Sequence, residues 1–347
     1  MSRQRLAVLL VGLGLLLTAA PGAAAPSRAS EEDAVRLLEE AARASRTLTY
    51  TGTKYVAAWR SSGSSTSLVD VRHDPRRGLR LSVSPTAASG DDAAAEDALV
   101  LAATTLDRGL LRALSRAYDL RVAGPGRCTG RDADVVEARR PGDPRAVAGR
   151  FWLDRETGLL LRREVYDDAG QRLRSSAFVD LETSGGSPVV ALGSDRPVGG
   201  NGEEVGDRDL DRLRDEGWPL PEELPGGFVL FDARRCGGQD GVLHLAFSDG
   251  LSTTSLFVQE GELGSAPPEG FVRGTVAEQP VWVHDGAPER LVWAGADRVW
   301  TLVSDAPEPA VTAAVAALPH ADLPDDGLRA RLARGLSRLG SWLNPFS

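Results

Sequence analysis

Two short apolar runs joined by the turn Ser248–Gly250 place the strongest constraint on how this chain folds. Residues 242–259 read Val-Leu-His-Leu-Ala-Phe-Ser-Asp-Gly-Leu-Ser-Thr-Thr-Ser-Leu-Phe-Val-Gln. Asp-Gly between alternating apolar residues is typical of a β-hairpin, because Gly accepts a positive φ without steric cost. The segment therefore predicts a half-buried hairpin. Asp249 is interpreted as a turn residue and not as a catalytic acid.

The first 25 residues have the pattern of a secretory signal peptide. Arg3 and Arg5 form a short basic region, residues 6–20 are apolar and uncharged, and residues 21–25 supply small residues for cleavage. The apolar run is shorter than the roughly 20 residues that span a bilayer. We expect an exported protein, with an uncleaved membrane anchor as the alternative.

The charge of the chain argues against a nucleic-acid partner. The formal net charge is −9, and removal of the segment 1–25 makes it −11, because that segment carries two Arg and no acidic residue. Nucleic-acid binding depends on neutralising phosphates, which an acidic exported chain does poorly. Lys54 is the only Lys and Ile is absent, which we interpret as codon bias.

Periodicity and turn residues divide the chain into two units of α+β structure. A helix is predicted over residues 30–46, with Ser30 as its cap, followed by several short strand-like runs and a second helix near 106–117. Such a pattern favours a curved antiparallel sheet packed on helices over residues 30–183. The Gly-, Ser-, Pro- and acid-rich segment 184–209 is predicted to be a linker.

The region 210–320 is predicted to be a second, smaller α+β domain. It contains the hairpin and further strand-like runs, and it ends in a helix from about Pro307 to Leu318 that Asp305 is expected to cap. About 320 residues after the signal segment agree with two domains of ordinary size.

Cys128 and Cys236 are the only cysteines. An oxidising compartment and an even count favour a disulfide, which would link the two predicted domains. The alternative is two separate thiols.

The tail 327–347 is predicted to be a basic amphipathic helix. Leu328, Leu332, Leu336, Leu339 and Leu343 fall on one stripe at helical spacing. Such a helix can lie on an anionic membrane surface, or it can dock on its own domain or on a partner. The residues that we expect to make this contact are Leu332, Leu336, Leu339, Trp342, Leu343, Arg334 and Arg338.

Local motifs for catalysis or metal binding are absent from the sequence. The four histidines lie far apart, and none stands at metal-ligand spacing from a Cys or a carboxylate. The chain has no G-x-S-x-G, no phosphate loop and no H-E-x-x-H. We predict a protein that is not an enzyme and needs no metal or cofactor.

Several motifs in order resemble the MucB/RseB family of extracytoplasmic regulators of sigma-factor signalling. They are Tyr50-Thr-Gly-Thr-Lys-Tyr-Val56, Arg150-Phe-Trp-Leu-Asp154, Thr157-Gly-Leu-Leu-Leu-Arg162, Leu224-Pro-Gly-Gly-Phe228 and Ser248-Asp-Gly-Leu-Ser-x-x-Ser-Leu-Phe-Val258. The resemblance implies a half-barrel similar to lipid carriers of the LolA and LppX type, followed by the smaller domain.

The resemblance also implies a function in the cell envelope or periplasm. Such proteins bind the external domain of an anti-sigma factor, protect it from proteolysis and respond to a lipid or lipoprotein under envelope stress. A lipid or lipoprotein carrier is the alternative, and a secreted hydrolase, which no local motif supports, is a third hypothesis. Candidates for the lipid cavity are Tyr50, Tyr55, Trp59, Phe151, Trp152, Leu159 and Leu161. Candidates for partner binding are Trp218, Phe228, Leu251 and Phe257.

Overall fold

The computed structural model describes two antiparallel sheets with four helices, all within residues 28–60, 63–83, 106, 108–143, 145–183, 196–197, 202–236, 241–264, 266–284 and 288–321. The predicted signal segment 1–25, most of the predicted linker 184–209 and the predicted tail helix 327–347 lie outside these residues. The described helices are α1 (Arg28–Thr47), α3 (Arg108–Ala117), α4 (Asp207–Asp215) and α5 (Glu308–Ala317).

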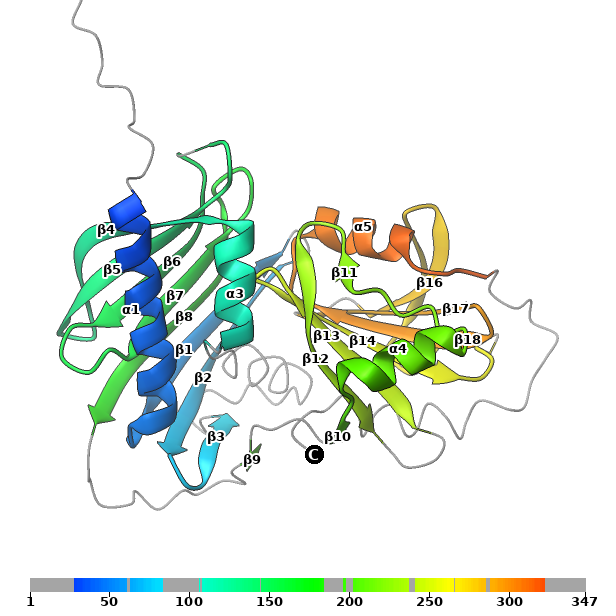
Figure 1. Ribbon diagram of the computed structural model, residues 1–347, viewed down its shortest axis with the longest axis horizontal. Helices are drawn as coiled ribbons and strands as arrows, with labels where there is room; N and C mark the ends of the chain where they lie inside the picture. The colour runs from blue at the N-terminus through cyan, green and yellow to red at the C-terminus, as the bar shows by residue number, and fades with distance from the viewer. Residues whose placement is uncertain are drawn as a thin grey trace, which may run out of the picture.

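The first sheet is a meander that carries α1 and α3 on one face (Figure 1). Its strands are β1 (Tyr50–Arg60), β2 (Gly63–Asp74), β3 (Gly78–Val83), β4 (Asp119–Cys128), β5 (Arg131–Arg139), β6 (Val147–Asp154), β7 (Leu160–Tyr166), β8 (Arg172–Thr183) and β9 (Arg196–Pro197). Their order across the sheet is β4-β5-β6-β7-β8-β1-β2-β3-β9. The pairing of β8 with β1 brings the last long strand beside the first and completes the helix-covered face.

The helices cover this sheet because their apolar residues recur at helical spacing. Ala34, Leu38 and Ala41 of α1 are almost fully buried, and they cluster with Leu114 of α3 and Phe151 of β6. The predicted helix and meander are thus confirmed in outline. Since α1 begins at Arg28, Ser30 lies inside its first turn and is not the N-cap that we expected.

The second sheet holds the predicted hairpin at its centre. Its strands are β10 (Glu203–Glu204), β11 (Glu223–Leu224), β12 (Phe228–Cys236), β13 (Val242–Ser248), β14 (Thr253–Glu260), β15 (Val272–Val276), β16 (Gln279–His284), β17 (Glu289–Gly295) and β18 (Arg298–Ser304). The order is β10-β12-β13-β14-β18-β17-β16-β15, with β11 beside β12. Both sheets contain nine described strands, so the second is as extensive as the first in strand number.

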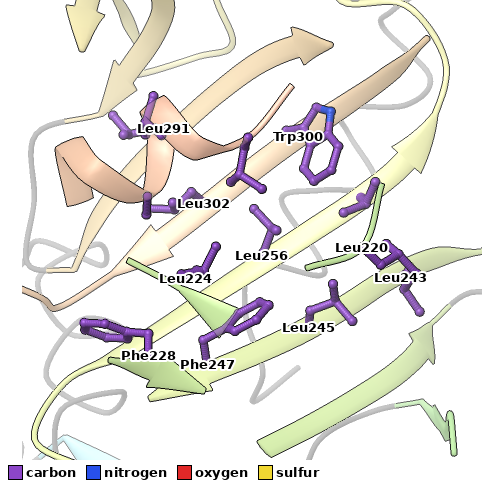
Figure 2. Packing of buried hydrophobic residues seen from close by; sticks show 14 of the residues in the cluster. Leu220, Leu224, Phe228, Leu243, Leu245, Phe247, Leu256, Leu291, Trp300 and Leu302 are labelled. Carbon is purple, nitrogen blue, oxygen red and sulfur yellow. The ribbon is translucent and has the colours of Figure 1, made fainter. Parts of the chain in front are cut away.

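The core of the second unit packs residues of its sheet against residues of α4, β11 and α5, and part of this cluster is shown in Figure 2. Leu245, Leu256 and Trp300 are fully buried there, and Leu224 and Phe228 join them from the strands β11 and β12. The indole N–H of Trp300 donates to the Gly295 carbonyl over 2.9 Å, which satisfies the buried donor. The sequence did not predict α4, because this short helix is mostly charged and buries only Leu210 and Leu213.

The predicted disulfide between Cys128 and Cys236 is wrong. Cys128 ends β4, and its sulfur lies 3.9 Å from the Leu161 carbonyl oxygen within the first sheet. Cys236 ends β12 in the second sheet, close to Gly202, where an added Cβ would lie 2.8 Å from the sulfur. The prediction rested on compartment and even count, and neither carries information about distance.

We expect Leu245→Ala to lower the free energy of unfolding by about 2–5 kcal/mol, because it empties a fully buried position that the sheet cannot refill. Urea denaturation followed by tryptophan fluorescence measures this loss. Val272→Ala is the control, since Val272 is 64% exposed and its truncation should change stability by less than about 0.5 kcal/mol. Equal effects of the two substitutions would contradict the assigned core.

Candidate functional site

The turn of the hairpin, residues 248–252, is closed by its own side chains. One carboxylate oxygen of Asp249 accepts the backbone N–H groups of Leu251 and Ser252 over 2.8 and 2.6 Å. The Ser248 hydroxyl donates to the Ser252 carbonyl over 2.7 Å and accepts the Gly250 N–H over 2.9 Å. Asp249 therefore has the turn role that we predicted. We call residues 248–252 the docking turn, because all five are buried against the first sheet.

The docking turn inserts into the first unit at α3. Gly250 has φ +89°, and a Cβ there would lie 2.4 Å from the Cβ of Leu114, so both the backbone angle and the space require glycine. The second carboxylate oxygen of Asp249 accepts the Tyr118 hydroxyl over 2.6 Å. Leu251 is 2% exposed and belongs to the hydrophobic cluster of the first sheet, where Gly149 leaves room for it.

Two arginines of the first sheet bind the backbone of the docking turn. Arg163 on β7 donates to the Leu251 carbonyl over 2.6 Å, and Arg174 on β8 donates to the same oxygen over 2.9 Å. Arg174 also donates to the Ser252 hydroxyl over 2.9 Å and forms an ion pair with Asp305. Both buried guanidinium groups depend on this one acceptor, because withdrawal of the carbonyl would remove a hydrogen bond from each of them.

Burial sets the electrostatics of this contact. Desolvation, followed by repulsion from Arg174, lowers the pKa of Arg163 to about 10. Asp305 compensates part of this positive charge and accepts the Thr253 N–H over 2.6 Å. The expectation that Asp305 caps the last helix is wrong: α5 has Pro307 at its N-cap and no side-chain cap, and the Asp305 carboxylate joins the two sheets instead.

A cavity of about 400 Å³ lies beside this contact. Trp59, Leu173 and Arg174 line it from the first sheet, and Asp305 and Pro307 line it from the second unit. Its walls are mostly apolar with a few charged groups, which is the usual character of small-molecule pockets between domains.

The cavity candidates of the first sheet divide between its two faces. Phe151 packs in the same cluster as α1, so its neighbour Trp152 points to the opposite face. Val56 packs against Ala44 of α1, so Tyr55 points away from the helices. By burial and alternation, Tyr50, Phe151, Leu159 and Leu161 lie on the helix-covered face, and Tyr55, Trp59 and Trp152 lie on the other. Their role in lipid binding stays a prediction.

Lys54, the only lysine, lies on the helix-covered face among apolar residues. Its ammonium group is 4.8 Å from the centre of the Phe178 ring, in the neighbourhood of Val56 and Val69 on the same face. Burial, with repulsion from Arg163, lowers the pKa of Lys54 to about 8. A partly exposed cation inside an apolar surface can attract an anionic group of a bound molecule.

The partner-binding candidates of the second unit differ in exposure. Phe228 is 3% exposed and belongs to the core, and Leu251 is held in the docking turn. Trp218 is half-buried beneath the Arg298 guanidinium, 4.2 Å from its ring centre, and Phe257 is half-buried and stacked on His244. Of the four candidates, Trp218 and Phe257 are therefore the two that a partner can reach while the two sheets are in contact. Their role in partner binding stays a prediction.

Sequence reasoning missed Tyr118, Arg163, Arg174 and Asp305, which hold the docking turn. No local motif marks them, because their partners lie 52 to 131 positions away in the chain. In the described part of the chain no group of three or more His, Cys, Asp or Glu side chains is placed to hold a metal ion. No helix within that part has the length and hydropathy needed to cross a membrane.

Gly250→Ala should destabilise the protein more than Gly217→Ala. Both glycines have nearly the same φ, +89° and +87°, so both substitutions carry a similar backbone cost of about 1–3 kcal/mol. Only Gly250 faces Leu114, whereas nothing lies within 4 Å of a Cβ at Gly217. Urea denaturation gives the two losses, and faster amide exchange in α3 of the Gly250 variant would show that the docking turn has withdrawn. Equal losses would contradict the close approach.

Lys54→Met should stabilise the protein below pH 8 by about 1–3 kcal/mol and have no such effect above about pH 10.5. The pKa of Lys54 is about 8 in the folded state, against 10.5 for an unperturbed lysine, so the unfolded state binds more protons between these values. The stability of the parent protein should therefore rise with pH across that window. Denaturation of both proteins from pH 7 to 10.5 measures the difference, and a gap that is constant with pH would assign it to packing.

Comparison with known proteins supports the resemblance inferred from the motifs. Residues 92–199 match the family model described as the MucB/RseB N-terminal domain. The sigma factor AlgU regulatory protein MucB of Pseudomonas aeruginosa is 34% identical over 149 residues, which are 42% of this chain and 45% of that protein. The chain therefore matches less than half the length of this curated relative.

Solved structures of MucB are also similar. A chain in the structure of the Pseudomonas aeruginosa MucA/MucB complex has a TM-score of 0.45 at 24% sequence identity. The match covers 83% of the present chain and 99% of the chain in the complex. A crystal structure of MucB has a TM-score of 0.47 at 21% identity, covering 82% and 97%. The family model and the curated relative thus confirm that the chain is similar to the MucB/RseB family through its N-terminal domain.

Proposed function

We propose that this protein is a non-enzymatic extracytoplasmic regulator that binds the external domain of an anti-sigma factor and protects it from proteolysis. The observation that carries the proposal is the 34% identity over 149 residues to a sigma factor regulatory protein. The signal-like segment 1–25 supports export to the periplasm or cell envelope. The negative net charge of the chain without residues 1–25 argues against a nucleic-acid partner. The sequence also lacks the local catalytic motifs of common enzymes, so we favour a protein partner over a substrate.

The helix-covered face of the first sheet is the surface that we assign to a lipid or lipoprotein signal. Val56, Val69, Val71, Leu81 and Phe178 form an apolar cluster on that face. The curvature of a half-barrel similar to carriers of the LolA and LppX type would enclose an acyl chain there. Lys54 adds one cation with a lowered pKa to this surface, which suits the charged end of an amphipathic ligand.

The docking turn provides the physical connection between such a signal and the partner. Leu251 is part of the hydrophobic cluster of the first sheet, although it belongs to the central hairpin of the second. A ligand that displaces Leu251 also removes an acceptor from Arg163 and Arg174. The two sheets would then separate, and the surface around Trp218 and Phe257 would change its position relative to the first sheet.

Binding and protection can be tested with the purified protein and the recombinant external domains of anti-sigma factors from its own organism. The parent protein should slow cleavage of one such domain by an added protease. The double variant Trp218→Ala and Phe257→Ala should bind that domain on the order of tenfold more weakly, since half-buried aromatic residues often dominate interfaces. Calorimetry gives the affinities, and electrophoresis follows the cleavage.

Val272→Ala is the matched control, because Val272 is an exposed apolar residue of the same sheet. It should leave both affinity and protection unchanged. Failure of every anti-sigma domain to bind would contradict the proposed function. Binding that the double variant does not weaken would retain the function and reject the assigned surface.

A lipid or lipoprotein carrier is the second candidate, favoured by the apolar cluster around Phe178 and by the single cation at Lys54. Native mass spectrometry of the protein from its own host separates the two functions. A co-purified acyl lipid that is transferred to acceptor vesicles, without any anti-sigma binding, would favour the carrier.

A further inference from the structure

The face of the first sheet that points away from α1 carries an ordered set of arginines, aromatic rings and carboxylates. Register places Glu137, Arg150, Glu164 and Ser175 in one row across β5 to β8. Trp152 and Arg162 lie in the neighbouring row of the same face, since they pair with each other two residues along from Arg150 and Glu164. Alternation puts these side chains opposite Phe151 and Arg163. We call this surface the arginine face.

Two buried carboxylates hold the guanidinium groups in position. Glu164 is 3% exposed and accepts hydrogen bonds from Arg162, from Arg172 over 2.8 Å and from the Tyr166 hydroxyl. Burial opposes ionisation of Glu164, but these hydrogen bonds outweigh it and lower its pKa. The guanidinium groups of Arg162 and Arg172 stay in place because the buried carboxylate of Glu164 needs several hydrogen-bond donors.

Glu137 does the same for a second pair of arginines. It is 5% exposed, and it accepts from the Nε atoms of Arg139 and Arg150 over 3.0 and 2.8 Å. Both carboxylates therefore stand below guanidinium groups that they orient toward the surface.

Three of the guanidinium groups lie over aromatic rings of the same face. The Arg162 guanidinium lies 4.8 Å from the centre of the Trp152 ring, and that of Arg172 lies 4.6 Å from the centre of Trp59. Arg150 lies 5.7 Å from the centre of the Tyr166 ring. Stacking fixes the plane of a guanidinium group without using its hydrogen-bond donors.

Most N–H donors of Arg150, Arg162 and Arg172 have no acceptor within the described part of the chain. A guanidinium group has five N–H donors. Arg162 and Arg172 each give one nitrogen to Glu164, and the Nε of Arg162 is buried without a partner. Arg150, Arg162 and Arg172 are nevertheless 39%, 34% and 43% exposed, so an anion can reach them.

The arginine face has an excess of positive charge in an acidic protein. Three arginines, at positions 150, 162 and 172, stand against the carboxylates of Glu137 and Glu164. At the rim, Arg140 pairs with Asp168 over 2.6 Å and contributes no excess. The chain as a whole has a net charge of −9, so this surface is a local reversal of sign. Such a patch attracts anionic partners and orients them.

We propose that the arginine face binds an acidic peptide segment in extended conformation, with Asp or Glu at alternate positions. Carboxylates are the acceptors that pre-oriented guanidinium groups bind best. Alternate side chains of an extended peptide are about 6.7 Å apart, which equals the spacing of successive rows on a sheet face. This inference goes beyond the proposed function, because it concerns the face opposite the helices and holds whether or not an anti-sigma domain binds.

The test uses a fluorescein-labelled peptide of about twelve residues with Glu at alternate positions, and the same peptide with Gln in place of Glu. Fluorescence anisotropy with the full chain should show binding of the Glu peptide at low salt, loss of binding near 0.5 M sodium chloride and no binding of the Gln peptide. The triple variant R150Q/R162Q/R172Q should bind the Glu peptide on the order of tenfold more weakly.

The matched control is R36Q/R116Q/R212Q, which removes the same charge from exposed arginines elsewhere, of 57%, 67% and 68% exposure. It should bind as the parent does. Arg172→Lys, which retains the charge and loses the planar donors, should weaken binding and gives a readout if the triple variant does not fold. Equal weakening by both triple variants would reduce the effect to net charge and overturn the proposal. So would absence of peptide binding, or binding to anionic phospholipid vesicles alone.

Discussion

The contact between the docking turn and two buried arginines is the interaction on which the arrangement of the two sheets depends. Arg163 and Arg174 cannot be buried without acceptors, and the Leu251 carbonyl supplies one to both. Asp305 neutralises Arg174 from the second unit, and Asp249 accepts from Tyr118 of the first. Because Arg163 and Arg174 share the Leu251 carbonyl, withdrawal of the docking turn would remove a hydrogen bond from both buried cations at once.

The strict alternation of side chains along the strands gives the first sheet two chemically different faces. Val56 and Phe178 face the helices with Lys54, whereas Trp152, Arg162 and Glu164 face the other way. The apolar face needs helices packed on it, because they remove its apolar side chains from contact with water. The arginine face needs no cover, because long guanidinium side chains shield the carboxylates beneath them and remain hydrated at their ends.

Local features were predictable from the sequence, and long-range ones were not. Ser248-Asp249-Gly250 predicted the hairpin turn, because glycine accepts the positive φ that such a turn requires. The place where that turn docks depends on Leu114 and Arg174, which lie far away in the chain and carry no motif. The predicted disulfide between Cys128 and Cys236 is wrong for the same reason, because local sequence does not tell which distant residues lie close together. Alternation divides the cavity candidates between two faces, but only contacts with α1 tell which face is covered.

Arginine performs two tasks in this molecule, and burial decides between them. At the docking turn, Arg163 loses its hydration, which lowers its pKa. Its guanidinium group donates to backbone carbonyls of the turn and therefore has a structural role. On the arginine face, Arg172 rests on Trp59, gives one nitrogen to Glu164 and keeps the others at the surface. A buried arginine such as Arg163 can bind another partner only when the two sheets separate. An arginine of the arginine face is available at all times, so a ligand there can bind without breaking the docking contact.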